Sequence, residues 1–196
     1  MQTNTPKSRS LMAYPAQGTF NRLLFKTPLF LWRTGLGPLI GGIYLVLTTR
    51  GRKSGRPRHT MVTYSSVAGK IYIASGWGQK TQWYRNLLAD PHVSVQTNQE
   101  TFSALARRVE DQDEFMLVMQ HMLATNQDLL FQPWLESLGI PMDLESILAN
   151  QSRIHLVALD RTIQPGPLPL EPDLVWLWPV LALVFVLGWL SGRLSR

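Results

Sequence analysis

A series of short segments in which apolar and polar residues alternate dominates the chain after Gly42. These segments are rich in β-branched and aromatic residues, and a period of two is typical of β-strands. Stretches with a helical pattern interrupt them at residues 81–91 and 111–124. A chain that mixes strands and helices in this way is predicted to have an α+β fold. The strand segments are GIYLVLTT, HTMVTYS, KIYIASG, HVSVQT, ETFSALARRVE and SRIHLVALD.

Residues between these segments carry turn and cap signals. The sequence AGK after Val67 predicts a tight hairpin between the second and third strand segments. Thr81 is a plausible N-cap for the first helix, and Pro91 marks the end of that helix. Asp111 precedes Glu114 by three residues, which is the spacing of a capping box. The acidic run around them is therefore interpreted as a helix start and not as a pair of catalytic carboxylates.

Charge is distributed unevenly over the 196 residues. The formal net charge is +6, yet the first 89 residues contain 13 Lys and Arg and no acid, whereas the remainder contains 6 Lys and Arg and 13 acids. Such a cationic half attracts anions, which include phosphorylated cofactors, anionic lipid and nucleic acid. Nucleic acid is the least expected of these partners, because the basic residues lack interleaved aromatic side chains. The chain has no cysteine and its 4 histidines show no ligand spacing, so no metal site is predicted.

The cations are densest in the stretch LTTRGRKSGRPRHT, between the first two strand segments. We call residues 50–58 the basic turn. Gly51 and Gly55 could let successive backbone N–H groups converge on an anion, and the side chains could add charge-assisted bonds to phosphate. A solvated hairpin tip would have the same composition, so the motif alone leaves both interpretations open. The spacing of a Walker loop is absent. The cations are Arg50, Arg52, Lys53, Arg56 and Arg58.

Three stretches resemble, in the same order, the deazaflavin-dependent nitroreductase family: LTTRGRKSGRPRHT, YIASGWGQKTQWYRNLLADPHVSVQ and TFSALARRVE. The resemblance covers about residues 20–160. It implies a split β-barrel of about six mainly antiparallel strands with flanking helices. It also implies an oxidoreductase that moves hydride between coenzyme F-420, an 8-hydroxy-5-deazaflavin with an anionic phosphate and polyglutamate tail, and a small organic acceptor.

The same resemblance implies which residues bind the coenzyme. Because the cofactor supplies the hydride chemistry and the protein supplies orientation and electrostatics, no catalytic side chain is assigned. The phosphate would be held by Arg52, Lys53, Ser54 and Arg58; the ring would lie along Thr60, Met61, Val62, Thr63 and Tyr64; and Ser75, Gly76, Trp77, Trp83 and Asn86 would surround the ring or its ribityl chain.

The chain departs from the family pattern after Val109. Many relatives have tyrosines over the substrate there, whereas this chain has an apolar stretch with Phe131 and Trp134. A lipophilic acceptor is therefore expected, such as a quinone or an enone, with nitro compounds as further candidates. Two alternatives remain open: an FMN-binding split-barrel oxidoreductase that uses the same turn, and a non-catalytic module that binds the coenzyme or anionic lipid. A homodimer is compatible with the sequence.

The regions flanking the predicted 19–160 domain differ from it in composition. Residues 1–18 are polar and are predicted to form a flexible tail. The amphipathic stretch from Phe20 to Trp32 is expected to pack on the barrel or to lie on an anionic bilayer. Residues 161–173 are rich in proline and are predicted to form a linker.

The uncharged stretch at residues 174–192 follows this linker. As a helix it would be about 28 Å long, close to the ~30 Å thickness of the hydrocarbon core of a bilayer. A single transmembrane helix is therefore predicted, with the chain as a single-pass membrane protein and its domain in the cytoplasm. Arg193 and Arg196 after the stretch favour the opposite orientation by the positive-inside rule.

Overall fold

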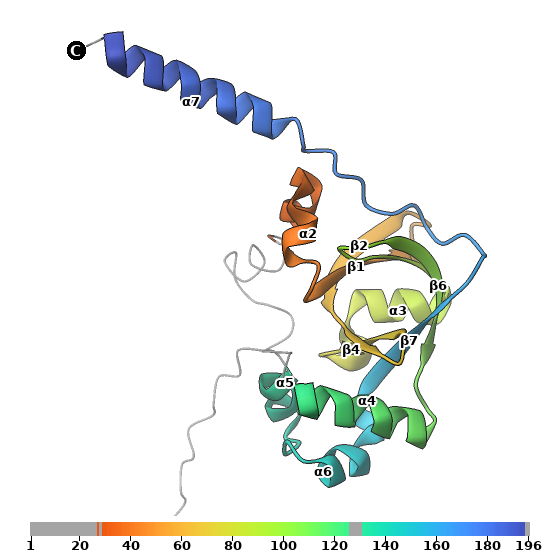
Figure 1. Ribbon diagram of the computed structural model, residues 1–196. Coiled ribbons are helices and arrows are strands. Elements are labelled where there is room, and N and C mark those ends of the chain that lie inside the picture. The colour runs from red at the N-terminus through yellow and green to blue at the C-terminus, as the bar shows by residue number, and fades with distance from the viewer. Residues whose placement is uncertain (1–26, 28, 126–130, 195–196) are drawn as a thin grey trace, which may run out of the picture.

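A curled antiparallel sheet forms the centre of the protein, whose computed structural model describes residues 27, 29–125 and 131–194 (Figure 1). The seven strands follow the order β2-β1-β5-β6-β7-β4-β3, and every neighbouring pair is antiparallel. There are seven strands because the predicted second segment divides at Tyr64 into β2 and β3. The strands are β1 (Tyr44–Arg50), β2 (Pro57–Thr63), β3 (Ser65–Val67), β4 (Lys70–Ser75), β5 (His92–Gln96), β6 (Thr101–Arg108) and β7 (His155–Arg161).

A tight hairpin joins β3 and β4, as the sequence predicts. Val67 lies opposite Lys70, which leaves Ala68 and Gly69 as the two turn residues. Both have positive φ, 50° and 76°, and two such residues give a turn whose twist matches that of the flanking strands. Gly69 adopts such a φ without strain. Ala68 is the one described residue other than glycine with a positive φ, so the pairing of β3 with β4 must hold it there.

The concave side of the sheet is filled by helix α3 (Gln82–Ala89), which lies inside the curl (Figure 1). Trp83, Tyr84 and Leu87 of this helix are buried against alternate residues of the strands. Burial of each such large apolar side chain contributes about 1.5–3 kcal/mol, so the inner cluster fixes α3 in the barrel. The strand residues of the inner cluster are Leu45, Leu47, Val62, Ile73, Val93, Val95, Ala104, Ala106, Val157 and Leu159.

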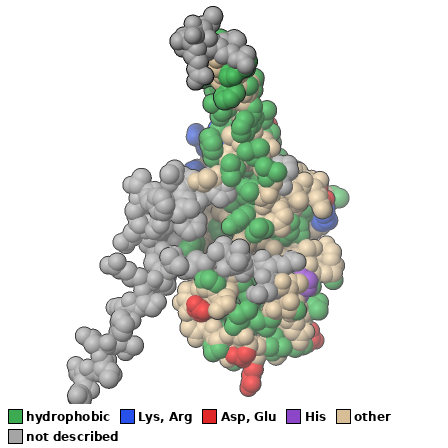
Figure 2. Space-filling view, turned by 60° about the vertical axis from the view of Figure 1, so that its left-hand side comes forward, with side chains coloured by type: hydrophobic (Ala, Val, Ile, Leu, Met, Phe, Trp, Pro, Cys, Tyr) green, Lys and Arg blue, Asp and Glu red, His purple; other side chains and the backbone are tan. Residues whose placement is uncertain are grey.

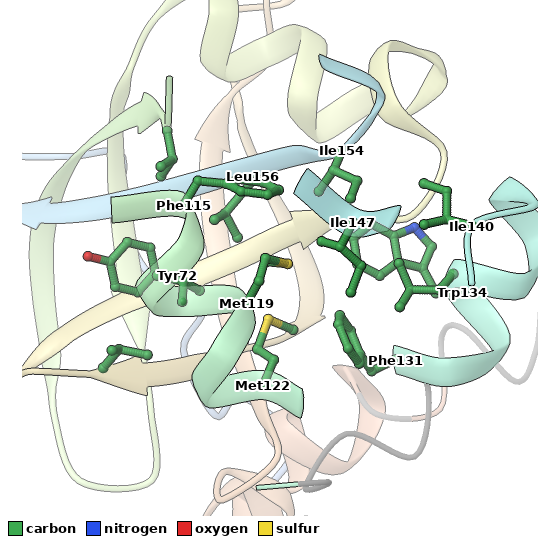
Figure 3. Close-up of a cluster of buried hydrophobic side chains, with 14 of the residues drawn as sticks. Tyr72, Phe115, Met119, Met122, Phe131, Trp134, Ile140, Ile147, Ile154 and Leu156 are labelled. Atoms are coloured by element: carbon green, nitrogen blue, oxygen red, sulfur yellow. The ribbon is translucent and has the colours of Figure 1, made fainter. Parts of the chain in front are cut away.

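Three helices, α4 (Gln112–Thr125), α5 (Phe131–Leu138) and α6 (Leu144–Ala149), pack over the convex face of β4 and β7. The Glu114 backbone N–H donates to Asp111 Oδ1 at 2.8 Å, which confirms the predicted cap of α4. The Glu114 carboxylate does not complete a capping box, because it accepts hydrogen bonds from Arg107 and Tyr72 instead. This outer cluster contains Tyr72, Phe115, Met119, Met122, Phe131, Trp134, Ile140, Ile147, Ile154 and Leu156, among others (Figure 3).

Short helical segments complete the chain around the barrel. They are η1 (Trp32–Leu36) and α2 (Gly37–Ile40) before β1, η2 (Gly78–Lys80) before α3, and η3 (Gln151–Arg153) before β7. The predicted tail at residues 1–18 lies outside the described residues. The amphipathic stretch from Phe20 lies mostly outside them as well.

The proline-rich segment after β7 is held against the barrel. The Gln96 side chain donates to Leu170 O at 3.0 Å and accepts from Leu170 N at 2.7 Å, as a strand neighbour would. The Arg33 guanidinium makes two bonds, of 2.7 and 2.6 Å, to the carboxylate of Asp173. The segment thus ties β5 to the region before β1.

The predicted transmembrane helix at residues 174–192 is wrong. Among the helices of the described residues, none has both the length and the apolar character needed to cross a bilayer. Residues 174–176 form turns, and Leu174 N donates to Arg33 O at 2.9 Å, so α7 (Leu177–Leu194) begins later than predicted. The predicted single-pass anchor therefore has no support.

Helix α7 extends away from the barrel, and Figure 2 shows it as a column of mostly hydrophobic side chains. Val184 and Phe185, for example, are 62% and 75% exposed.

Candidate functional site

The backbone of the basic turn is closed by its own hydrogen bonds. Gly51 N donates to Arg56 O at 2.9 Å, and Ser54 N and Gly55 N both donate to Gly51 O, at 3.0 and 2.7 Å. A Cβ on Gly51 would lie 2.8 Å from Ser54 Oγ, which explains the glycine there. In residues 51–56 the described hydrogen bonds use every backbone N–H except that of Lys53. The expected convergence of backbone N–H groups on an anion is therefore not formed, and anion binding here would depend on side chains.

A buried amide connects the basic turn to α3. Asn86, only 4% exposed, accepts hydrogen bonds at Oδ1 from Arg52 N (3.3 Å) and Arg52 Nη1 (3.0 Å). Its Nδ2 donates to Thr49 Oγ1 at 3.1 Å. Arg52 Nη2 also donates to Gln82 Oε1 at 3.0 Å. Asn86 and Arg52, both predicted to touch the cofactor, thus contact each other, and the turn is held at a fixed position beside the helix.

The cations of the basic turn differ in their partners. Arg50 forms an ion pair with Asp90, with 2.9 Å between Nε and Oδ2. Arg52 bonds only to neutral amides, and Arg58 Nη2 lies 3.4 Å from Ser54 Oγ. The ion pairs of the described residues include no carboxylate for Arg52, Lys53, Arg56 or Arg58.

All four of these side chains are exposed. Positive charges without counter-charges attract an anion, and guanidinium and ammonium groups form strong bonds to phosphate. The turn therefore fits a phosphorylated group such as the tail of coenzyme F-420.

Strand β2, predicted to line the cofactor ring, is an edge of the sheet, and within the described residues it pairs with β1 alone. Thr60 and Val62 lie opposite the inner-cluster residues Leu47 and Leu45, so they face the concave side. Met61 and Thr63 alternate with them and face outward. The free edge of β2 leaves backbone groups for a flat heterocycle to bind.

Tyr64 ends this predicted ring-binding stretch. Its hydroxyl donates to Gly41 O at 3.0 Å, and burial raises the pKa of the phenol. The hydroxyl is thus used to join the end of β2 to the loop that precedes β1.

The residues after β4, also predicted to approach the cofactor, form a rigid turn. Ser75, 2% exposed, donates from Oγ to Gly78 O at 2.9 Å and lies 2.9 Å from Thr81 Oγ1. Thr81 Oγ1 lies 3.0 Å from the same carbonyl, so Thr81 holds this turn instead of capping a backbone N–H of α3. Gly76 and Trp77 are partly exposed on the turn. Of these predicted residues, Ser75 therefore has a structural role.

The His155 imidazole packs against the turn that follows β4. Gly78 has a φ of +53°, and a Cβ there would lie 2.9 Å from Cε1 of His155. His155 Nδ1 lies 3.0 Å from Arg153 O, which requires Nδ1 to carry a proton, and burial lowers the pKa of the ring. The neutral ring packs edge-on against Tyr84 at 5.1 Å between centroids. No local pattern signals this contact, because residues 78 and 155 are far apart in the chain.

Trp83, another predicted cofactor contact, is a core side chain. It is 8% exposed and packs edge-on against Tyr84 with 5.8 Å between ring centroids. Phe131 and Trp134, expected over the substrate, are 3% and 5% exposed within the outer cluster.

Two shallow hollows occur elsewhere on the described surface, with volumes of about 290 and 350 Å³. They flank the β3–β4 hairpin, where both are bordered by Lys70, and no predicted cofactor residue lines either one. Neither hollow has the uncompensated cations of the basic turn.

Comparison with known proteins identifies the family of this chain. The sequence model of the F420H(2)-dependent quinone reductases matches residues 33–140, more than half of the chain. The chain belongs to the F420H(2)-dependent quinone reductase family. The matched residues include the basic turn, β2, the turn after β4 and α3. The predicted relationship to F-420-dependent split-barrel oxidoreductases is thus confirmed, with F420 as the coenzyme of the family.

Individual members of the F420H(2)-dependent quinone reductase family match a smaller part of this chain than the family model does. An F420H(2)-dependent quinone reductase of Mycobacterium tuberculosis is 32% identical over 72 residues, which cover 35% of this chain and 48% of the relative. The chain thus spans about half the length of the curated relatives that it matches.

Solved structures resemble the chain only at the level of a general likeness. The F420-H2-dependent reductase FDR-A has a TM-score of 0.42 and 22% identity, covering 60% of this chain and 93% of its own. A conserved hypothetical protein of Mycobacterium tuberculosis has a TM-score of 0.38 and 20% identity, covering 66% and 78%. These values carry no argument about function.

Proposed function

We propose that this protein reduces a quinone with hydride from F420H2, and that the basic turn holds the phosphate of the coenzyme. The observation that carries the proposal is a set of four exposed cations without counter-charges, on a turn that Asn86 fixes beside α3. A turn whose backbone is already held in place loses little backbone freedom when its side chains bind an anion, which favours binding.

The predicted residues that stay accessible have distinct parts in this proposal. Lys53, Arg56 and Arg58 bind the phosphate directly, and Arg56 is an addition to the set inferred from the sequence. Arg52 contributes charge while its guanidinium stays on α3. Residues 60–64 offer the edge of β2 to the ring, and Gly76 and Trp77 border it from the end of β4.

When bound, the reduced coenzyme supplies the hydride. The chain orients the ring against the free edge of β2, neutralises the tail and keeps water from the reacting face. The cofactor-binding unit in this proposal is the barrel predicted as residues 19–160. A quinone is the first acceptor to test because the family is named for quinone reduction. Enones and nitro compounds are further candidates.

Fluorescence titration of the chain with oxidised coenzyme F420 tests the proposal. Lys53→Ala and Arg58→Ala each remove one charged partner of the phosphate, which should weaken binding by about 1.5–3 kcal/mol, or roughly 10- to 150-fold. Lys70→Ala is the matched control, because it removes the same charge at the other end of β4 from Ser75 and should leave affinity unchanged.

Three results would contradict the proposal. Equal affinities of the wild type, Lys53→Ala and Arg58→Ala would remove the basic turn from the binding site. Tighter binding of FMN than of F420 would favour the alternative flavin cofactor. Coenzyme binding without oxidation of F420H2 by the soluble quinone menadione would leave a binding module and contradict the reductase activity.

A further inference from the structure

One buried polar group in the outer cluster has no hydrogen-bond partner. Trp134 of α5 is 5% exposed, and within the described part of the chain its indole Nε1 is the one buried side-chain nitrogen or oxygen atom without a partner. An unsatisfied buried donor costs about 1–3 kcal/mol, so such groups are rare in folded proteins. The cost suggests that an acceptor from outside the chain completes this site.

The unsatisfied N–H lies next to the proposed cofactor site. A Cβ built on Gly76 would lie 3.6 Å from Trp134 Cδ1 and 3.9 Å from Nε1, so this edge of the indole faces the end of β4. Figure 3 shows the nitrogen on the side of the ring near Ile140, at the margin of the cluster. Phe131 supports the ring from another side, with 5.8 Å between centroids and a tilt of 49°. The donor is thus held in a fixed direction beside Gly76.

The surroundings of the N–H limit what can bind it. The neighbouring side chains of the outer cluster are apolar, so a phosphate or carboxylate would lose its hydration without a counter-charge. An uncharged carbonyl oxygen satisfies the donor without that cost.

We infer that the Trp134 indole N–H binds a carbonyl oxygen of the acceptor, which makes Trp134 a specificity-determining residue for quinones. This inference rests on the proposed function, because the acceptor must reach Gly76 at the edge of the coenzyme site. It also gives a role to Trp134, which lies in the stretch after Val109 where many relatives have tyrosines.

Nuclear magnetic resonance of the ¹⁵N-labelled full chain tests the inference directly. The Trp134 indole signal is assigned from triple-resonance spectra of the wild type, so the chemical-shift test does not depend on whether Trp134→Phe folds. The absence of this signal in Trp134→Phe checks the assignment. Menadione is then added in the presence of oxidised F420. A new hydrogen bond should move the indole proton signal downfield, and Trp134→Phe should bind menadione about 3- to 10-fold more weakly, as expected for a neutral hydrogen bond.

A matched variant separates the N–H from packing. Phe131→Leu disturbs the same cluster but keeps the indole, so it should preserve the downfield shift. Without ligand, Trp134→Phe should lose less stability than Phe131→Leu, because it removes an unsatisfied donor together with part of the ring. An unmoved indole signal when menadione binds, or equal menadione affinities of wild type and Trp134→Phe, would overturn the inference. F420 affinity, read from coenzyme fluorescence, reports separately on the proposed function.

Discussion

Replacement of Asn86 by alanine should destabilise the protein and displace the basic turn. The Asn86 side chain makes three hydrogen bonds: two from Arg52 and one to Thr49. Each bond contributes about 1 kcal/mol to stability. The bond from the charged Arg52 guanidinium is given no larger value, because it lies at the surface and is weakened by solvent. Asn86→Ala should therefore lower the free energy of unfolding by about 3 kcal/mol, and the small cavity that it leaves would add to this loss.

Urea unfolding followed by circular dichroism measures this change as a shift of the midpoint at constant slope. Arg52→Ala alone should cost less, about 1 kcal/mol, because its guanidinium is exposed. In the double variant the two losses should not add, since each removes the same bond, and a coupling of about 1 kcal/mol is expected. A loss below about 0.5 kcal/mol for Asn86→Ala, typical of an unconstrained surface position, or full additivity would refute the proposed link between the turn and α3.

Two further perturbations test parts of the fold around the site. Gly78→Ala should lower the free energy of unfolding by at least about 2 kcal/mol, because φ is +53° and the new Cβ would lie 2.9 Å from the His155 ring. Gly55→Ala, at φ +66° in open space, should lower it by only about 1 kcal/mol. Thermal unfolding compares the two variants, and equal losses of stability would exclude the His155 contact. The hydrogen bond that the His92 ring donates from Nδ1 to the Asp90 carboxylate raises the pKa of His92. This contribution to stability is present below pH ~6.5 and is lost as pH rises through the folded pKa. The melting temperature of wild type should therefore exceed that of His92→Gln most at low pH, and a difference that grows with pH would contradict this pairing.

Local sequence signals account for much of the fold. The segments rich in β-branched and aromatic residues became strands, although β1, β5 and β7 are buried on both faces and not on one. Gly69 suits the positive φ of the hairpin turn. Asp111 caps α4 as its spacing predicts. In each case the physical cause lies within a few residues of the chain, where a pattern can reveal it.

Features that depend on distant contacts were not predictable in the same way. Asn86 reaches Arg52 and Thr49 across 34 and 37 positions, so its structural role could not be separated from a cofactor contact by spacing alone. The apolar stretch after residue 173 predicted a transmembrane helix, but Arg33 holds Leu174 in a turn and shortens the helix. Phe131 and Trp134 were predicted to lie over the substrate, and no local pattern indicated that the outer cluster would leave them only 3% and 5% exposed.

The binding of the coenzyme phosphate by the basic turn is the central claim, and a crystal structure of the full chain with oxidised F420 tests it most directly. The account predicts a phosphate oxygen about 2.7–3.2 Å from Lys53 Nζ or the Arg58 guanidinium, with the ring along the free edge of β2. A phosphate bound elsewhere, with both cations pointing into solvent, would contradict it.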